Sequence, residues 1–536
     1  MSESHKKQKI DQNQYTGYTI PSSTTTVPTI DLSSSQITPK DFFDTYISKR
    51  KPVKLVNNTD SKKDSFIDID KFKLKNIQTT LNYNDEFLQV EEMFQGGFGS
   101  GQKRIDMMFG DLVEEFKNGG RELYLTTQYD REGEDDKEDE EVEEEEDDDD
   151  EDDDDEEQNE EAKESEEEED GEEEGPVLFD QMSNASSIDM NGLHDDFDDF
   201  NDESTKDSEY EAYQRVKTLY QPPLTNLAKS LSSPILPTNP PLIPNLIPQQ
   251  INIWMGKISP SKAQFSIDTS KPLTQLDRSI PQNGTSSGLH HDHADNLYIL
   301  IQGRKRFTIY SPCDALKLYT VGQVYKIFQN GVIDYETSQE FPNWRSIRDD
   351  GAIIEEVLNW QISQTEDEAE INRLNELLEI QETKRRKIGA QRKDSIVSEE
   401  LSQDPPSFSK IPPCLLHIDE VEDIKQQEKL IEFANTHFPG FLQLNQMTVW
   451  LNSGEMLYLP ASWFHEVSSF GTGNQDDEEN TGVHIALNYW FVPPNTDDFE
   501  NCYKDQYWEQ DWQQTKTAID VFANAVKVEE EEQEEE

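Results

Sequence analysis

The sequence predicts a mainly β domain with helices at its periphery and a long disordered insertion. Apolar runs at 296–301, 456–460 and 483–491, and a segment at 305–310 in which Phe307 and Ile309 share one face, have the length of buried strands. Only 33% of the 536 residues are hydrophobic and the mean hydropathy is −0.88, so much of the chain cannot form a packed core. One folded domain that is interrupted by disordered segments fits this composition better than several domains.

The N-terminal part begins with a polar tail and continues into the folded domain. Residues 1–36 are rich in Ser, Thr and Gln and have no apolar period, which predicts disorder. A helix should follow, because Thr38 can cap its N-terminus and Pro39 suits its first position. Further strands are expected at 52–56, 88–90, 104–108, 123–128 and 250–256, with a short helix at 109–116.

A highly acidic segment then interrupts the domain. Residues 132–211 carry 45 acidic and 3 basic side chains, which is most of the formal net charge of −65. Like charges at this density repel one another and cannot bury a core, so we expect a disordered insertion. Two interpretations remain open. The segment is either a solvating insert or an arm that binds basic proteins such as histone tails or ribosomal proteins; nucleic-acid binding is not expected.

Three residues form a candidate iron site. His290 and Asp292 are two residues apart, so in an extended segment their side chains lie on one face. His465, which follows a buried strand, is the expected third ligand. Two histidines and one carboxylate leave three positions open on an octahedral Fe(II), enough for a chelating co-substrate and O2. A register slip would make His291 and His293 the ligands instead.

A lysine close to these residues indicates an anionic ligand. The two apolar runs in 296–310 and the turn at 302–304 predict a β-hairpin. In its second strand Lys305 shares a face with Phe307 and Ile309, so Lys305 would point into the barrel. An unpaired charge in that position lowers the free energy of unfolding by roughly 3–5 kcal/mol. The distal carboxylate of 2-oxoglutarate would supply the counter-charge.

A second insertion separates the two halves of the site. Apolar residues at 353–358, 371–378 and 419–434 recur at helical spacing and predict helices outside the barrel. The basic cluster 384–393 is interpreted as a nuclear localisation signal, a nucleic-acid contact or an exposed helix end. The amphipathic segment 497–527 predicts one or two closing helices that could support a homodimer.

The expected organisation is a tail at 1–36, domain parts at 37–131, 212–312 and 441–496, insertions at 132–211 and 313–440, closing helices at 497–527 and an acidic tail at 528–536. The three cysteines are far apart in the sequence, so neither a disulfide framework nor a zinc cluster is expected. No apolar run reaches the roughly 18 residues of a membrane span, and the N-terminus lacks a signal-peptide core. We therefore expect a cytoplasmic or nuclear protein.

Three motifs together resemble the JmjC-domain 2-oxoglutarate oxygenases, which have a cupin or double-stranded β-helix fold. They are Leu-His-His-Asp-His-Ala-Asp-Asn-Leu-Tyr (289–298), Gly-Arg-Lys-Arg-Phe (303–307) and Leu-Pro-Ala-Ser-Trp-Phe-His-Glu-Val (459–467). The chain is most similar to the small JmjC protein hydroxylases, particularly the lysyl-hydroxylase branch. The resemblance implies that Fe(II) binds to His290, Asp292 and His465, and that 2-oxoglutarate binds to Lys305 with Ser287, Tyr298, Tyr124 and Asn488 around it.

The resemblance implies hydroxylation of a protein side chain, with a lysine as one possible target, and with conversion of 2-oxoglutarate to succinate and CO2. Histone lysine demethylation is the alternative, and the basic cluster and the acidic segment favour it slightly. A third hypothesis is a catalytically silent barrel that serves as an interaction scaffold. The partner expected in the first two cases is a protein substrate, with a basic protein as one candidate.

Overall fold

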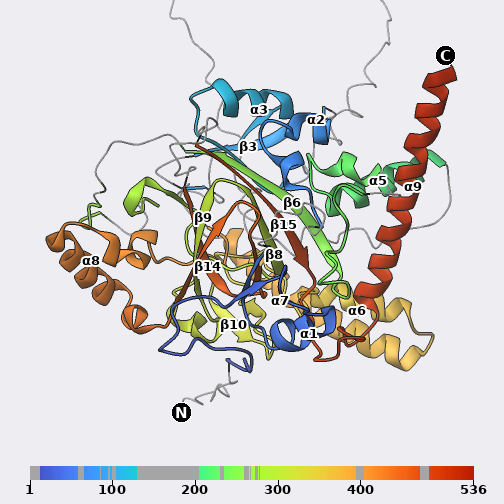
Figure 1. Cartoon of the computed structure of the whole chain (residues 1–536). Coiled ribbons are helices and arrows are strands. Elements are labelled where there is room, and N and C mark those ends of the chain that lie inside the picture. The colour runs from blue at the N-terminus through green and yellow to red at the C-terminus, as the bar shows by residue number, and fades with distance from the viewer. Residues whose placement is uncertain are drawn as a thin grey trace, which may run out of the picture. The chain divides into compact units, whose positions relative to one another are not determined.

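Figure 1 shows the computed structural model of the chain, which describes residues 12–57, 66–128, 205–229, 234–393, 404–470 and 482–535, apart from gaps at 85, 94–96, 99–103, 259–264, 266, 272–275 and 277. Most of the acidic insertion expected at 132–211 lies outside these residues, so its disorder stays a prediction. The last part of the expected insertion is among the described residues and is not disordered, because residues 205–211 belong to a helix.

The strands are β1 (Thr29–Asp31), β2 (Val53–Val56), β3 (Leu88–Glu92), β4 (Arg104–Met107), β5 (Leu123–Leu125), β6 (Pro248–Lys257), β7 (Thr285–Ser286), β8 (Asp295–Gln302), β9 (Arg304–Tyr310), β10 (Val324–Ile327), β11 (Ile333–Tyr335), β12 (Met447–Asn452), β13 (Met456–Leu459), β14 (Phe464–Phe470) and β15 (Val483–Phe491). The α-helices are α1 (Pro39–Phe42), α2 (Ile77–Leu81), α3 (Phe109–Asn118), α5 (Thr205–Leu219), α6 (Ile354–Ser363), α7 (Glu368–Lys393), α8 (Ile424–His437) and α9 (Tyr507–Glu535). Shorter helical turns are η1 (Phe43–Ile47), η3 (Ile69–Phe72), η5 (Thr225–Lys229), η7 (Pro281–Asn283), η8 (Pro312–Lys317), η9 (Pro413–Leu416), η10 (Ile418–Glu420) and η11 (Phe441–Gln443).

Two sheets build the barrel. Within the described chain, nine strands form a large sheet in the order β1-β2-β13-β8-β15-β6-β5-β3-β4, and four form a small sheet in the order β12-β9-β14-β7. The pairing of β1 with β2 is parallel, and the other pairings in these two sheets are antiparallel. The mainly β, cupin-type fold that the sequence predicts is confirmed.

Side chains from both sheets meet in the barrel interior. Tyr298 and Leu300 of β8 pack in one apolar cluster with Phe307 and Ile309 of β9, and Ala486 of β15 joins them. Residues i and i+2 of a strand share a face, so the other even-numbered residues of β15 face inward as well. This alternation directs the polar side chains described below into the interior.

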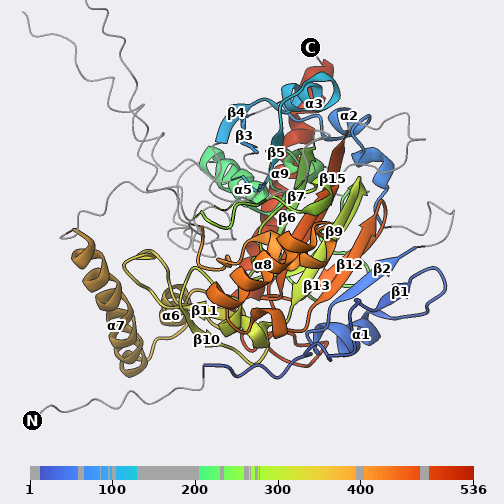
Figure 2. The same ribbon diagram turned by 90° about the vertical axis from the view of Figure 1, so that its left-hand side faces the viewer.

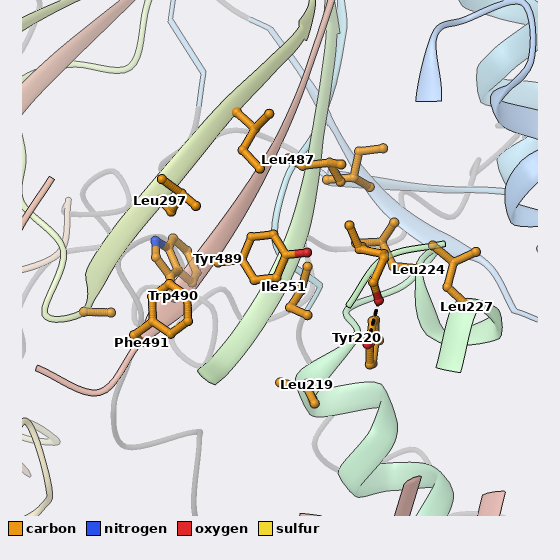
Figure 3. Close-up of a cluster of buried hydrophobic side chains, with 14 of the residues drawn as sticks. Leu219, Tyr220, Leu224, Leu227, Ile251, Leu297, Leu487, Tyr489, Trp490 and Phe491 are labelled. Carbon is orange, nitrogen blue, oxygen red and sulfur yellow. Dashed lines mark hydrogen bonds between the residues drawn. The ribbon is translucent and has the colours of Figure 1, made fainter. Parts of the chain in front are cut away.

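The outer face of the large sheet is covered by helices and by the segment after α5. Figure 3 shows Leu224 and Tyr220 from that segment beside Ile251 of β6 and Tyr489 of β15. The amide of Gln221 donates to the carbonyl of Ile251 and so ties this segment to the sheet. Helix α9 packs against α5 and η5 on this side.

The predicted hairpin over 296–310 is wrong. β8 pairs with β13 and β15 in the large sheet, whereas β9 pairs with β12 and β14 in the small sheet. The chain crosses between the sheets at Gly303, whose φ is +88°, a value that L side chains rarely adopt. Apolar runs around a glycine turn occur in both arrangements, so the sequence pattern could not distinguish them. The inward position predicted for Lys305 is nevertheless correct, because Phe307 and Ile309 lie in the interior cluster.

The prediction of a disordered tail is wrong for residues 12–36. In this segment Ile20 and Val27 are buried, and β1 pairs with β2 beside α1 (Figure 2). The apolar residues that anchor the segment are widely spaced, so they produce no periodic pattern. The helix signal after it is confirmed, since Thr38 caps α1 in a reciprocal capping box with Asp41.

The second insertion contains the expected helices α6, α7 and α8. It also contains β10 and β11, an antiparallel pair that the sequence reading missed. At the C-terminus the structure has one helix, α9, which begins at Tyr507 and continues to Glu535 through most of the expected acidic tail. None of the helices in the described residues is both long enough and apolar enough to span a lipid bilayer.

Candidate metal centre and co-substrate site

The backbone brings the two candidate histidine ligands together from distant parts of the chain. His290 lies just after β7 and His465 lies in β14, and they form an isolated antiparallel bridge. The amide of His290 donates to the carbonyl of His465 at 3.0 Å, and the amide of His465 donates back at 2.7 Å. Asp292 is fixed nearby, because its carbonyl accepts from the amide of Ser462 at 2.7 Å. His290 and Asp292 thus lie in a loop before β8 and not in a continuous strand as expected.

Both imidazoles present the same ring nitrogen to the interior. Nδ1 of His290 is 3.0 Å from the Gly288 carbonyl, and Nδ1 of His465 is 2.9 Å from the Trp463 carbonyl. A carbonyl can only accept, so Nδ1 carries a proton in each ring, and in the neutral form of either ring the lone pair lies on Nε2. Nε2 of His465 is 3.6 Å from Oδ2 of Asp292. One donor atom from each of the three side chains lies within 4.8 Å of the others, close enough to hold one metal ion.

Burial acts differently on two of the three donors. Burial lowers the pKa of His290 well below its usual value, and the neighbouring His465 adds to this effect, so the ring stays neutral. Burial raises the pKa of Asp292, which a divalent cation would oppose. Asn296 and Trp490 lie beside this carboxyl and favour its ionised form. Neither residue is predicted from the sequence as a support of Asp292.

The two alternative histidines take structural roles. Nε2 of His291 lies 2.6 Å from the hydroxyl of Tyr335, and Nε2 of His293 lies 2.9 Å from the carbonyl of Ile333. Both rings are fully buried against aromatic side chains, among them Tyr335 and Trp344. A register slip in the metal motif is therefore not supported.

Lys305 is buried without a counter-charge. Its side chain is 1% exposed, and among the described residues no carboxylate forms an ion pair with it. Burial lowers its pKa to about 7. Its Nζ lies 3.4 Å from the hydroxyl of Tyr124 and 5.6 to 5.7 Å from the ring centres of Phe98, Tyr124 and Tyr298. Aromatic faces compensate only part of the charge, so this arrangement suits an anionic ligand.

The other residues predicted for the co-substrate also face the interior. Tyr298 lies opposite Asn488 in the large sheet, and burial raises the pKa of both Tyr124 and Tyr298 well above the usual value. Oδ1 of Asn488 accepts a hydrogen bond of 2.7 Å from the indole of Trp254. The hydroxyl of Tyr298 has no hydrogen-bond partner among the described residues.

The hydroxyl of Ser287 already makes two hydrogen bonds within the protein. Its hydroxyl donates to the carbonyl of Gly288 at 2.8 Å and accepts from the amide of Val467 at 3.0 Å. Donation to a ligand would require the hydroxyl to give up the bond to Gly288. The role expected for Ser287 stays a prediction.

Two hydroxyl groups that the sequence reading missed are better placed. In the small sheet Ser469 lies opposite Lys305 on one side and opposite Thr285 on the other. The side-chain oxygens of Ser469 and Thr285 are buried and have no partner among the described residues. Nothing in the local sequence marks these residues, because only the pairing of β7, β14 and β9 brings them to Lys305.

A segment of the second insertion closes one side of the metal centre. The ring of Phe408 stacks on that of His290 with the centroids 4.7 Å apart and an interplanar angle of 11°. Arg278 packs against Phe408, with its guanidinium 5.4 Å from the centre of the Phe408 ring. It also donates to the carbonyls of Ser287 and Phe98, both at 2.9 Å.

These observations fit a ferrous ion and 2-oxoglutarate. Two imidazoles and one carboxylate are a donor set that suits Fe(II) and leaves positions for other ligands. Further inside, the unpaired ammonium of Lys305 and the unpartnered hydroxyls of Thr285 and Ser469 match a carboxylate.

Comparison with known proteins agrees with this architecture. The sequence model of a family described as a cupin-like domain matches residues 39–497. The chain is also 29% identical over 556 residues to JmjC domain-containing protein 4 of Schizosaccharomyces pombe, in an alignment that covers 92% of this chain and 90% of that protein. The match spans both insertions and both halves of the site. The chain therefore belongs to the family of cupin-like domain proteins, and it is similar to a JmjC domain-containing protein.

Proposed function

We propose that the protein is an Fe(II)- and 2-oxoglutarate-dependent dioxygenase that hydroxylates a side chain of another protein. The observation that carries this proposal is the convergence of His290, Asp292 and His465 on one point, with the unpaired Lys305 deeper in the barrel. A scaffold without activity would have no need of a buried charge that lacks a partner, because such a charge destabilises the fold.

Each residue has a defined task under this proposal. His290, Asp292 and His465 would hold the metal, and the carbonyls of Gly288 and Trp463 keep the two rings oriented with Nε2 available. Bound iron, with 2-oxoglutarate and O2, supplies the chemistry that places one oxygen atom on the substrate while 2-oxoglutarate becomes succinate and CO2. Lys305 would orient 2-oxoglutarate through its distal carboxylate. The apolar interior around Phe307 and Ile309 excludes water from the reaction.

The substrate class rests on the likeness to the small JmjC hydroxylases, which favours a protein side chain and, within that class, lysine. Demethylation of a lysine would use the same metal centre. The two reactions differ in their products, since hydroxylation adds one oxygen atom to the peptide and demethylation removes a methyl group.

Mass spectrometry of a cell lysate would test the proposal. The lysate would be incubated with Fe(II), 2-oxoglutarate and either the wild-type protein or the Asp292→Ala variant. We expect a peptide that gains one oxygen atom only with the wild type, together with succinate. Loss of a methyl group instead would identify a demethylase, and the absence of both succinate and any modified peptide would favour the scaffold.

A further inference from the structure

His484 is a fully buried histidine that is not one of the three candidate metal ligands. It lies near the start of β15, and its side chain is 0% exposed. Neither ring nitrogen has a hydrogen-bond partner among the described residues. The carbonyl of Gly482 favours the protonated ring electrostatically, but it makes no hydrogen bond of ordinary geometry. A buried imidazole without a partner is costly, so its retention calls for a ligand.

The ring faces the same interior as Lys305. His484 shares the inward face of β15 with Ala486 and Asn488. In the large sheet, Gly256 lies between His484 on one side and Tyr124 on the other. A Cβ atom on Gly256 would lie only 2.6 Å from Nε2 of His484 and 2.6 Å from the Tyr124 ring. The glycine therefore leaves room for both rings to extend over it into the barrel.

The contacts of Tyr124 connect His484 to Lys305. The rings of Tyr124 and His484 have their centroids 5.8 Å apart, and the Tyr124 hydroxyl is 3.4 Å from Nζ of Lys305. The charge of Lys305 is close enough to lower the pKa of His484, in addition to the larger effect of burial. Two basic side chains thus lie side by side in a region where no described carboxylate pairs with Lys305.

We propose that His484 is a second positioning residue for 2-oxoglutarate, which binds the distal carboxylate together with Lys305. This inference rests on the proposed function. In it, the neutral imidazole donates a hydrogen bond to one carboxylate oxygen, while Lys305 supplies the charge and a hydrogen bond to the other. His484 does not contact the metal or the substrate, so it acts on the affinity and orientation of the co-substrate.

Equilibrium binding without turnover would test this role. The full-length protein would be loaded with Mn(II), and the dissociation constants of two acids would be measured by calorimetry. The acids are 2-oxoglutarate and 2-oxopentanoate, which has the same carbon chain but ends in a methyl group. Comparison of the two separates the contacts of the distal carboxylate from those of the metal-binding end.

In the His484→Leu variant we expect the affinity for 2-oxoglutarate to fall about 10- to 100-fold, the effect of a lost hydrogen bond to a charged group. The affinity for 2-oxopentanoate should change less than about threefold. The His484→Gln variant keeps a donor and should recover at least half of the lost binding free energy. An equal loss for both acids, or no loss for either, or the same loss with Gln as with Leu, would overturn the proposal.

A matched control comes from the opposite face of the same strand. The Tyr489→Phe substitution removes a buried hydroxyl that donates to the carbonyl of Pro237 at 2.9 Å, outside the barrel interior. It should leave both dissociation constants unchanged. If wild-type protein binds Mn(II) but no 2-oxoglutarate, the proposed function itself fails, which is distinct from a failure confined to His484.

Discussion

Single polar side chains decide how the barrel interior can bind an anion. Four buried polar side chains come from four different strands: Lys305, His484, Thr285 and Ser469. No described carboxylate forms an ion pair with Lys305, and the polar side-chain atoms of the other three have no hydrogen-bond partner among the described residues. Such groups destabilise the protein without a ligand and favour the bound state when a ligand satisfies them. The protonation state of Lys305 should therefore be visible in ligand affinity.

The first prediction concerns pH. Burial lowers the pKa of Lys305 to about 7, so the free protein loses this charge as the pH rises above 7. A carboxylate binds the protonated form, so the affinity of the Mn(II) form for 2-oxoglutarate should fall above pH 7, by up to about tenfold per pH unit. Tyr124 and Tyr298 have raised pKa values and His484 a lowered one, so all three stay neutral between pH 7 and 9.

The control for this profile is the Lys305→Arg variant. A guanidinium stays charged throughout this range, so the variant should bind 2-oxoglutarate with an affinity that does not depend on pH, even if it binds more weakly. A flat profile in the wild type, measured by calorimetry from pH 6 to 9, would contradict the assigned role of Lys305.

The second prediction concerns a buried ion pair beside the metal loop. Arg50 pairs with Asp295 through both carboxylate oxygens, and Asp295 also accepts from the Tyr458 hydroxyl at 2.6 Å and the Ala461 amide at 2.9 Å. The Asp295→Ala substitution leaves the Arg50 charge buried and should lower the free energy of unfolding by about 3–5 kcal/mol in urea titrations.

Two further variants define this effect. The double substitution Arg50→Met with Asp295→Leu removes both charges and should recover much of the loss. Arg373→Ala removes an exposed ion pair with Glu370 in α7 and should have no measurable effect. If Asp295→Ala behaved like Arg373→Ala, the pair would not anchor the metal loop.

The crossing from β8 to β9 places Lys305 in the sheet opposite that of Tyr298. This crossing depends on Gly303, since a Cβ atom there would lie 2.7 Å from the Cβ and 3.0 Å from the Cα of His484. The left-handed backbone at Gly303 and the close approach of β15 both exclude a larger residue. The turn and the proposed co-substrate residue His484 are thus packed against each other.

The third prediction follows from this contact. Gly303→Ala should lower the free energy of unfolding by about 2–3 kcal/mol, because it combines backbone strain with overpacking. Gly440→Ala is the control, since Gly440 has a φ of +92° but no atom within 4 Å of the added Cβ. The Gly440→Ala substitution should lower the free energy of unfolding by only about 1 kcal/mol. Equal losses in thermal or urea unfolding would show that the contact with His484 does not matter.

Most strands and helices could be predicted from local sequence patterns. The pairing of strands and their assignment to one sheet or the other could not. The runs at 456–460 and 483–491 became β13 and β15, and the capping signal at Thr38 marks α1. The sheet to which β9 belongs is decided by its pairing with β12 and β14, from parts of the chain more than a hundred residues later. Local pattern carries no information about such long-range pairing.

The same reason explains which site residues were found. His290, Asp292 and His465 lie in short motifs, so a likeness to a family reveals them. Thr285, Ser469 and His484 have no motif, and the strand register alone brings them to Lys305. Residues 12–36 were missed because their buried side chains, such as Ile20, are too sparse to form a period.

The candidate site links the two sheets of the barrel. His465 and Lys305 belong to the small sheet, whereas Asp292 leads directly into β8 of the large sheet. A metal and a co-substrate that touch both sheets should resist their separation. The fourth prediction is that Mn(II) with 2-oxoglutarate at 100 times its dissociation constant raises the free energy of unfolding by about 2.7 kcal/mol.

Urea unfolding with and without the two ligands would measure this stabilisation. The Asp292→Ala variant is the control, and its unfolding should not respond to the ligands. A response of the variant equal to that of the wild type would show that the ligands bind elsewhere on the chain.

The bridge between His290 and His465 also fixes when the metal centre can form during protein synthesis. The two residues are 175 positions apart, and all of the second insertion is translated between them. A nascent chain on the ribosome that carries His290, Asp292 and Lys305 still lacks β14 and its histidine. The full set of three candidate ligands therefore exists only after almost nine-tenths of the chain has been made.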